Sequence, residues 1–289
     1  MEKNKRSLDM LVASMFIFGT IGVVRRYIPL PSATIAVARG LTGAAFLLLF
    51  LLLVRKQKPD GAAIRRNLAL LLVSGAVMGA NWIALFEAYN FTSVAVATLC
   101  YYMAPVFVIL LSPLILREKL TPRKCFCAGA AIVGMVLVSG VLGGSGDGSL
   151  SGVLLGLLAA VLYAGVILLN KKMKPMPGLD RSVIQLAAAG IVLLPYALLT
   201  GGGGEATPLG LALLAVVCVV HTGLAYALYF GSMEGLPAHT IALLSYIDPV
   251  VAVLLSALML REPISLWTIV GAVLILGAAV LGELPEKSE

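Results

Sequence analysis

The chain has 289 residues, of which 60% are hydrophobic and 12% are charged, and its net charge is +7. About a quarter of the residues in a soluble globular domain are charged, so this chain has too few charges to cover a water-facing surface. The composition therefore excludes an ordinary soluble domain and indicates a membrane protein. Nucleic-acid binding is not expected from the positive charge, because the basic residues stand in short segments between long apolar runs.

The apolar runs are long and continuous, as in AAFLLLFLLLV at residues 44–54, whereas barrel strands alternate polar and apolar positions. A helix needs about 20 mostly apolar residues to cross a bilayer. The sequence therefore predicts an all-α membrane protein with ten transmembrane helices. We expect these at residues 8–27, 32–54, 67–88, 92–116, 122–142, 150–170, 182–200, 208–232, 237–260 and 265–283. The first resembles a signal peptide but has no small-x-small cleavage site after it, so we treat it as a span.

The distribution of lysine and arginine predicts the orientation of these helices. With a cytoplasmic N-terminus, the cytoplasmic segments carry 17 of the 21 basic residues, and the outer segments carry only Arg25, Arg26 and Arg261. The remaining one, Arg39, lies within a span. Because cytoplasmic loops hold the positive excess of membrane proteins, we expect both termini on the cytoplasmic side of the plasma (inner) membrane.

The chain repeats itself at an offset of 144 residues. Residues 94–120 align with residues 238–264 without a gap, and 11 of the 27 positions are identical. Shared leucines mean little in membrane spans, whereas coinciding tyrosine, proline and Arg-Glu positions are hard to obtain by chance. The informative pairs are Tyr102/Tyr246, Pro105/Pro249, Ser112/Ser256, Arg117/Arg261 and Glu118/Glu262.

Each half of the chain would hold five helices. Since five is odd, the second half enters the membrane upside down, which predicts two inverted five-helix repeats. We expect the first repeat at residues 1–142, an extracytoplasmic glycine-rich linker at 143–149 and the second repeat at 150–289. Inverted repeats are a common architecture of secondary transporters, which bind their substrate near the midplane between the halves.

The residues that carry the repeat also carry a resemblance to a known family. The Tyr-x-x-Pro…Arg-Glu pattern at 102–118 and 246–262, with Pro31 and then Arg39 in the second span, resembles the EamA-type branch of the drug/metabolite transporter superfamily. The resemblance covers essentially the whole chain. It implies ten helices in two inverted repeats and the movement of small metabolites such as amino acids, often as efflux.

Two prolines indicate where a transport path would lie. Pro105 and Pro249 stand near the middle of their spans, and a proline leaves the carbonyl four residues earlier without its helical partner. These carbonyls belong to Tyr101 and Ser245. Because a free carbonyl is costly in lipid, we expect both helices to line the path, with the neighbouring Tyr102 and Tyr246. The alternative is that the prolines only bend the helices for packing.

Two charged residues within the spans are candidates for solute contact. Asp248 is a carboxyl near the bilayer centre, where charged groups usually mark ion or substrate paths, and it could carry a proton. A structural hydrogen bond is the equal alternative. The guanidinium of Arg39 could pair with a substrate carboxylate or phosphate. Equally, it could extend outward toward the membrane surface or bond a helix carbonyl.

Four more residues complete the candidate site. Trp82 aligns with Tyr226 across the repeat, and both rings could stack on a solute or merely pack. His221 and Glu87 are further candidates for proton coupling. The plainer interpretations are a hydrogen-bonded core histidine and a carboxylate at the membrane boundary.

No cofactor, metal site or catalytic group is expected. Cys125 and Cys127 have no histidines or second cysteine pair nearby, so a metal site is not indicated. Ser145 and Asp147 occur in patterns of membrane proteases, but both stand in the glycine-rich linker, which we interpret as a flexible connector. A phosphate-binding loop is also missing, so the chain has no visible means of using ATP.

These observations predict a secondary active or facilitative transporter that moves small metabolites or drug-like compounds by alternating access. The expected partners are a small-molecule substrate, the lipid bilayer and protons. A monomer is favoured over a dimer, because the small-residue seams Gly75-x-x-x-Gly79 and Gly152-x-x-x-Gly156 more commonly pack helices within one chain. The alternatives are a membrane-embedded hydrolase or protease, which would need a nucleophile beside a base, and a channel.

Overall fold

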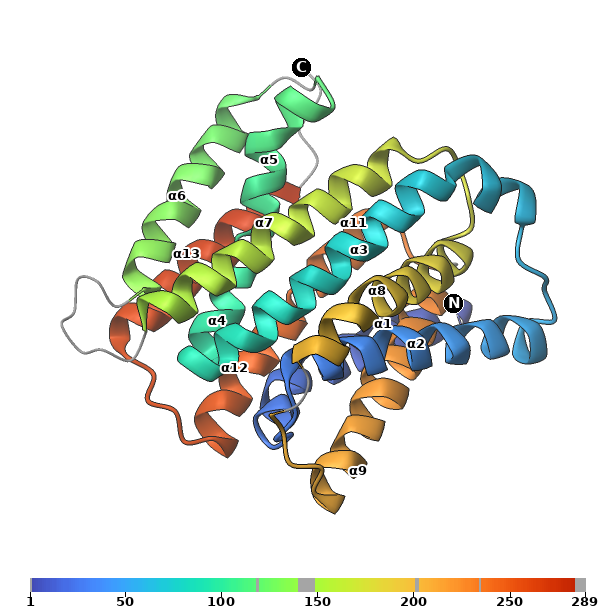
Figure 1. The fold of residues 1–289 in the computed structure, drawn as a ribbon. Helices are drawn as coiled ribbons and strands as arrows, with labels where there is room; N and C mark the ends of the chain where they lie inside the picture. The colour runs from blue at the N-terminus through green and yellow to red at the C-terminus, as the bar shows by residue number, and fades with distance from the viewer. Residues whose placement is uncertain (1, 118–119, 140–148, 201–202, 234, 284–289) are drawn as a thin grey trace.

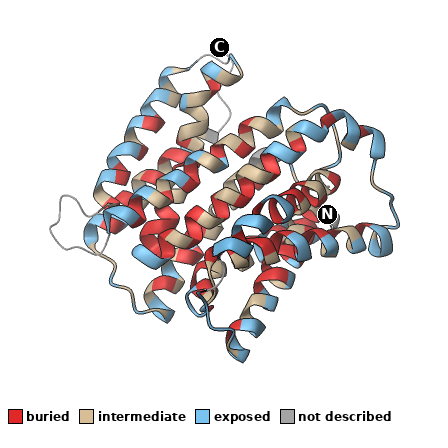
Figure 2. Cartoon of the chain, in the orientation of Figure 1, coloured by how far each residue is buried: buried red, intermediate tan, exposed pale blue. Residues whose placement is uncertain are grey.

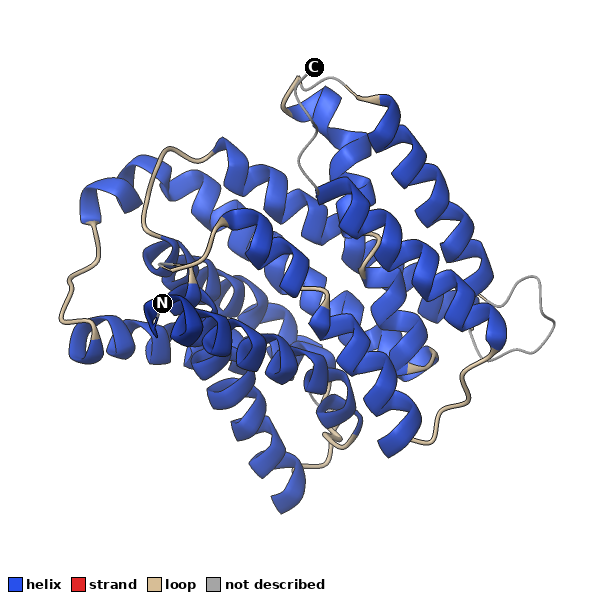
Figure 3. Cartoon of the chain, turned by 180° about the vertical axis from the view of Figure 1, so that it is seen from behind, coloured by secondary structure: helices blue, strands red, loops and turns tan. Residues whose placement is uncertain are grey.

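The computed structural model describes residues 2–117, 120–139, 149–200, 203–233 and 235–283. The described residues fold into helices joined by short connections (Figures 1 and 3). In chain order these are α1 (Glu2–Arg26), α2 (Ser32–Leu49), η1 (Phe50–Val54), α3 (Gly61–Phe91), α4 (Val94–Tyr101), α5 (Ala104–Ile115), α6 (Pro122–Val138), α7 (Leu150–Lys172), α8 (Gly178–Thr200), α9 (Pro208–Val216), η2 (Val217–Leu224), α10 (Ala225–Ser232), α11 (Ala238–Leu244), α12 (Ile247–Met259) and α13 (Leu266–Glu283).

Within the described residues, segments that continue one another form ten helices, as the sequence predicts. Most boundaries agree within a few residues, but α1 begins at Glu2 instead of 8 and α3 at Gly61 instead of 67. For α3 the reason is local, because the Oδ1 atom of Asp60 accepts the N–H groups of Ala62 and Ala63 at 3.1 and 3.0 Å. This N-cap starts the helix before the apolar stretch begins. The linker residues Ser145 and Asp147 and the repeat residue Glu118 lie outside the described residues.

Eight of the described helices are long and apolar enough to cross a membrane. The two shorter ones are α6, with 17 residues, and α13, whose apolar part is Leu266–Gly282. Seventeen residues are at the lower limit for a span. Exposed residues lie along the outward helix faces (Figure 2). Many of the exposed residues are large and apolar, and Leu199 and Leu114 are 86% and 81% exposed. A surface of this kind is suited to lipid rather than water, so the all-α membrane fold is confirmed.

The contacts between helices follow the internal repeat. The helix α3 packs against α7 and α8, and its counterpart in the other half, formed by η2 and α10, packs against α1 and α2. In the same way α5 packs against α7, and its counterpart α12 packs against α1. Two further large interfaces join counterparts directly, α2 with α8 and α6 with α13. The largest helix interfaces therefore recur in both halves.

Glycines lie at the contacts between α2 and α8 and between α6 and α13. A Cβ atom on Gly40 of α2 would lie 2.6 Å from the backbone nitrogen of Gly190 in α8, and one on Gly134 of α6 would lie 2.7 Å from the carbonyl oxygen of Gly271 in α13. Backbone cannot give way as a flexible side chain can, so these interfaces require glycine.

The glycine seams of α3 and α7 also lie within the chain. A Cβ atom on Gly75 would meet Ala188 of α8 at 2.6 Å, and one on Gly156 would meet Cys100 of α4 at 2.7 Å. Both seams therefore pack helices of the same chain against each other.

The two helical segments that contain Pro105 and Pro249 are interrupted rather than continuous. The first breaks between α4 and α5, and the second between α11 and α12, so Pro105 and Pro249 lie in the first turn of a new helix. A proline is tolerated there because the first N–H groups of a helix have no intrahelical partner. The carbonyl of Ser245, expected to be free, accepts the N–H of Asp248 at 3.3 Å. That expectation was wrong because the chain tightens at the break.

Candidate functional site

The two helix breaks border a cavity of about 350 Å³ in the middle of the helices. Its walls come from both halves, with residues of α1 to α5, α7 and α10 to α12. We call it the central cavity. Nine of the residues singled out from the sequence line it: Arg39, Trp82, Tyr101, Tyr102, Pro105, Tyr226, Ser245, Tyr246 and Asp248. Pro249 is buried directly behind Asp248.

Asp248 stands on the cavity wall at the start of α12. The hydroxyl of Tyr102 donates a hydrogen bond to its Oδ2 atom at 2.7 Å, so this contact joins the second half of the chain to the first. A carboxylate costs several kcal/mol when it is taken out of water without partners. One hydroxyl satisfies only part of the hydrogen-bonding capacity of a carboxylate, and the rest faces the cavity.

Arg39 occupies a different wall, on α2, and is 5% exposed. Its Nε atom donates to the hydroxyl of Thr222 at 2.9 Å, and its guanidinium carbon lies 4.2 Å from the ring centre of Trp82. A second ring, that of Phe86, lies 5.5 Å from the same carbon. Such cation–π contacts stabilise a desolvated cation by about 2 kcal/mol. They hold the planar group in one orientation beside the cavity.

A π-helical segment positions the partner of Arg39. Thr222 lies in η2, and its hydroxyl donates to the carbonyl of Val217, five residues earlier, at 3.0 Å. The oxygen therefore has a lone pair left for Arg39. The wider turns of a π-helix often occur at functional sites. No sequence pattern marked this segment, so Thr222 was missed.

Aromatic rings form most of the remaining wall. The rings of the repeat-related Tyr102 and Tyr246 have centres 6.3 Å apart, and Tyr101 lies 5.9 Å from Tyr102 and 5.3 Å from Tyr163. These separations are typical of favourable aromatic pairs. Sequence reasoning missed Tyr163. Its counterpart at the 144-residue offset is Gly19, which the sequence does not mark as a site residue, so the repeat carried no signal for Tyr163.

Asn81 adds a buried hydrogen-bond acceptor to the cavity wall. It is 1% exposed, and its Nδ2 atom donates to the carbonyl of Ala159 at 2.6 Å. That contact fixes the orientation of the amide, since a carbonyl accepts only from the NH₂ group. The Oδ1 atom has no hydrogen-bond partner among the described residues. A buried acceptor without a partner is costly, so a donor on a bound solute would satisfy it.

The other two candidates for proton coupling lie away from the cavity walls. His221 is 2% exposed, and its Nε2 atom lies 2.8 Å from the hydroxyl of Thr20. That hydroxyl also donates to the carbonyl of Ile17 at 2.7 Å, and the Nδ1 atom of His221 lies 3.4 Å from the carbonyl of Val216, so both ring nitrogens have polar partners within the protein. Glu87 is half-buried and accepts a hydrogen bond from Asn90 at 3.1 Å.

A second cavity, of about 480 Å³, lies between the α2–α3 connection and the start of α8. Lys58, Asp60 and Asp180 contribute to its walls, but Asp180 is occupied in accepting the backbone N–H of Asp60 at 2.8 Å. None of the residues singled out from the sequence lines this second cavity. The smaller central cavity is therefore the better candidate. Among the described residues, no group of three or more His, Cys, Asp or Glu side chains could hold a metal ion.

Comparison with known proteins gives the same match in both halves. The model of the EamA-like transporter family matches residues 7–140 and again residues 150–282. The chain is 29% identical over 273 residues to the uncharacterized transporter YxxF of Bacillus subtilis, covering 94% of this chain and 87% of that protein. It is 27% identical to the uncharacterized transporter YwfM of the same organism, covering 100% of this chain and 97% of the relative.

Two further comparisons extend these matches. Protein PecM of Dickeya dadantii is 29% identical over 216 residues, which cover 73% of this chain and 72% of that protein. A protein of known crystal structure matches with a TM-score of 0.66 and 17% identity over 96% of each chain. At that identity the structural match supports the fold alone.

Proposed function

The chain belongs to the EamA-like transporter family, and on that premise we propose that it moves small amphipathic metabolites, such as amino acids or drug-like compounds, through the central cavity by alternating access. Membership makes it a multi-pass membrane transporter and not an enzyme. One observation carries the proposal. Arg39 and Asp248 stand on the walls of a single aromatic-lined cavity between the two repeat-related helix breaks.

The transport cycle would use the two halves as inverted repeats that rock around the cavity. Their exchanged helix contacts support this, as do the odd number of helices in each half and the excess of basic residues on one side. We place both termini in the cytoplasm, residues 1–142 and 150–289 in the two repeats and 143–149 in the outer linker. The glycine seams are used within the chain, which favours a monomer in the plasma (inner) membrane.

The chemistry of the walls favours a solute that carries two opposite charges on a partly apolar body. Its ammonium group would bind Asp248, and its carboxylate would accept from the Nη groups of Arg39, since Thr222 takes only the Nε donor. Its apolar part would lie against the rings of Tyr101 and Tyr163. A volume of about 350 Å³ is at the lower end of ligand pockets, which suits a small metabolite.

Proton coupling is assigned to Asp248 rather than to His221 or Glu87. Of these three residues, Asp248 is the one that lines the cavity. Solute and proton can therefore compete for its carboxylate. Such competition drives exchange, because release of the solute on one side follows protonation there. The proposed direction is efflux, which rests on the family resemblance.

Reconstitution in liposomes tests the proposal. Purified protein is expected to carry labelled amino acids or related zwitterions across the membrane without ATP, and to accumulate them when a proton gradient is imposed. The Asp248→Asn variant should lose the gradient-driven accumulation and keep solute exchange only at high solute concentration, because its affinity for the solute falls. Folded protein that moves no member of a broad metabolite panel would contradict the proposed function. Accumulation that survives in the variant would remove Asp248 as the proton carrier.

A further inference from the structure

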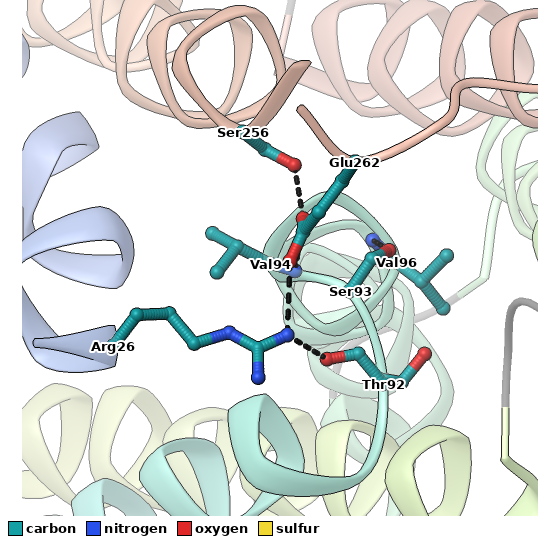
Figure 4. A network of polar contacts seen from close by, with 7 residues as sticks. All are labelled: Arg26, Thr92, Ser93, Val94, Val96, Ser256 and Glu262. Atoms are coloured by element: carbon teal, nitrogen blue, oxygen red, sulfur yellow. Dashed lines mark hydrogen bonds and ion pairs between the residues drawn. The ribbon is translucent and has the colours of Figure 1, made fainter. Parts of the chain in front are cut away.

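A second polar cluster lies outside the central cavity, where α1, α4 and α12 meet at one end of the molecule (Figure 4). Its centre is Glu262, which follows α12. The Oε1 atom of Glu262 pairs with Nη2 of Arg26 at 2.9 Å, and its Oε2 atom accepts the backbone N–H of Val94 at 2.8 Å and the hydroxyl of Ser256. The same Nη2 of Arg26 donates to the carbonyl of Thr92 at 3.0 Å. We call these five residues the Glu262 latch.

The Arg-Glu motif explains how this carboxylate is aimed. Arg261 has a left-handed backbone, with φ of 55°, and the N–H of Glu262 bonds back to the carbonyl of Ser256 at 3.3 Å. This is the geometry with which many helices end. It turns the chain so that the Glu262 side chain folds back over the last turn of α12. Ser256 therefore holds Glu262 through both its carbonyl and its hydroxyl.

Glu262 also completes the start of a helix that belongs to the other half of the chain. Val94 is the first residue of α4, and the first N–H groups of a helix have no intrahelical partner. Ser93 caps the N–H of Val96 at 3.1 Å, and Glu262 takes the N–H of Val94. A carboxylate is favoured at a helix N-terminus by the helix dipole.

The latch and the central cavity act on the same two helices. At one end of α4 its N-terminus is bonded to Glu262, and directly after the other end Tyr102 is bonded to Asp248 of α12. A helix of eight residues is about 12 Å long, so α4 and α12 are fastened at two points roughly that far apart. The wall of the cavity that contains Asp248 cannot open toward this end while both bonds hold.

We infer that the Glu262 latch is a gate that keeps one mouth of the central cavity closed. This inference rests on the proposed alternating access. The Arg26 side chain is 32% exposed and that of Glu262 is 13% exposed, so the ion pair is partly open to water. An exposed ion pair contributes about 1 kcal/mol or less, and the further hydrogen bonds that the Glu262 carboxylate accepts from Val94 and Ser256 strengthen the contact. They are also reversible, because the charged groups can be hydrated once the helices separate.

The gate predicts a change of access on one side of the membrane. We would replace the four native cysteines, introduce Ala242→Cys on the cavity wall and measure its reaction with a membrane-impermeant maleimide added to either side of oriented vesicles. Glu262→Gln keeps the shape of the side chain but loses the charge that holds Arg26. Labelling from the latch side should become at least fivefold faster in this variant, and labelling from the other side should not increase.

Two further variants keep the test decisive. Arg26→Gln breaks the same ion pair from the other helix and should raise labelling in the same way. It also tests the gate if the Glu262→Gln variant does not fold. Arg66→Gln is the matched control, because Arg66 likewise donates to a backbone carbonyl, that of Pro175 at 3.0 Å, outside the latch. It should leave labelling unchanged. Unchanged labelling in both latch variants, or equal increases from both sides, would overturn the gate.

The labelling needs no solute, so its result is separable from the proposed function. Latch-dependent labelling without any solute flux would refute the solute proposal and leave the gate standing. Solute flux with labelling that ignores the latch would refute the gate alone.

Discussion

The two helix breaks at the central cavity have the same frame and different chemistry. Each has a tyrosine at the break, a proline in the next first turn and a left-handed arginine after that helix, with φ of 58° in the first half and 55° in the second. The residue before the proline differs, since Ala104 stands where the second half has Asp248. Both residues line the cavity. The repeat therefore determines the backbone geometry of both breaks, and the charge comes from a position at which the two halves differ.

The other charged residue of the cavity follows the same rule. At the 144-residue offset, Arg39 of α2 corresponds to Val183 of α8. Arg39 and Asp248 therefore each occur in one half of the chain, and the matching position of the other half is uncharged. This asymmetry suits a solute with two different ends, and it can be broken experimentally at either residue.

The largest effect is expected from removing the charge of Asp248. Asp248→Asn keeps the volume of the side chain but removes the partner of a cationic group, and truncating one member of a buried charge pair costs roughly 2–5 kcal/mol. Apparent affinity for an ammonium-bearing solute should fall at least about 30-fold, measured as KM for exchange in liposomes.

Its matched control moves the carboxylate to the other break. The double variant Asp248→Ala/Ala104→Asp should not restore the affinity, because the new carboxylate would lack the Tyr102 hydroxyl at 2.7 Å. Full recovery would mean that the two breaks are chemically equivalent.

A smaller effect is expected from Arg39→Lys. Lysine keeps the charge but loses the planar group that stacks on Trp82 and bonds Thr222. We expect roughly tenfold weaker binding of carboxylate-bearing solutes, which corresponds to about 1.4 kcal/mol. Competition between a zwitterion and its methyl ester measures this, since the ester should lose no affinity. An equal loss for both solutes would assign Arg39 to structure alone.

Tyr102→Phe should act more weakly on the same carboxylate. It removes one hydrogen bond to a charged group, and substitutions of this kind cost about 1.5–3 kcal/mol when the group stays buried; water entering the cavity would reduce the loss here. A three- to tenfold rise in KM is expected. Tyr101→Phe is the control, because the Tyr101 hydroxyl has no hydrogen bond among the described residues, and its KM should stay within twofold of the unmodified protein.

The smallest effect is expected at the prolines. Pro105→Ala and Pro249→Ala each add an N–H in a first helical turn, where no intrahelical acceptor is lost or gained. Thermal unfolding in detergent should change by only about 1 kcal/mol or less in either variant. A loss above about 3 kcal/mol in one of them would show that this break is under strain that the other lacks.

The sequence predicted the parts of the structure that repeat. Long apolar runs determine the ten helices, and the coincidence of Tyr102 with Tyr246 marked the two breaks around the cavity. The proline rule identified the helices correctly but misjudged one carbonyl, because it assumed that the helix of Ser245 continues through the proline.

Features that depend on contacts between distant segments could not be predicted in this way. The π-helical turn that gives Thr222 to Arg39 has no residue signature. The pair of Arg26 and Glu262 joins residues 236 positions apart, and its helix-capping role depends on how α1, α4 and α12 converge. Neither the repeat offset nor the hydropathy contains that information.

Asp248 and Arg39 are proposed to bind the two charged ends of one solute. The most direct test is competitive binding to the purified protein of an amino acid, its methyl ester and its N-acetyl derivative, which keep both charges, only the cation and only the anion. We predict that the amino acid binds most tightly, that Asp248→Asn removes its advantage over the N-acetyl derivative, and that Arg39→Lys reduces its advantage over the ester. Equal binding of all three, unaffected by either substitution, would contradict the account.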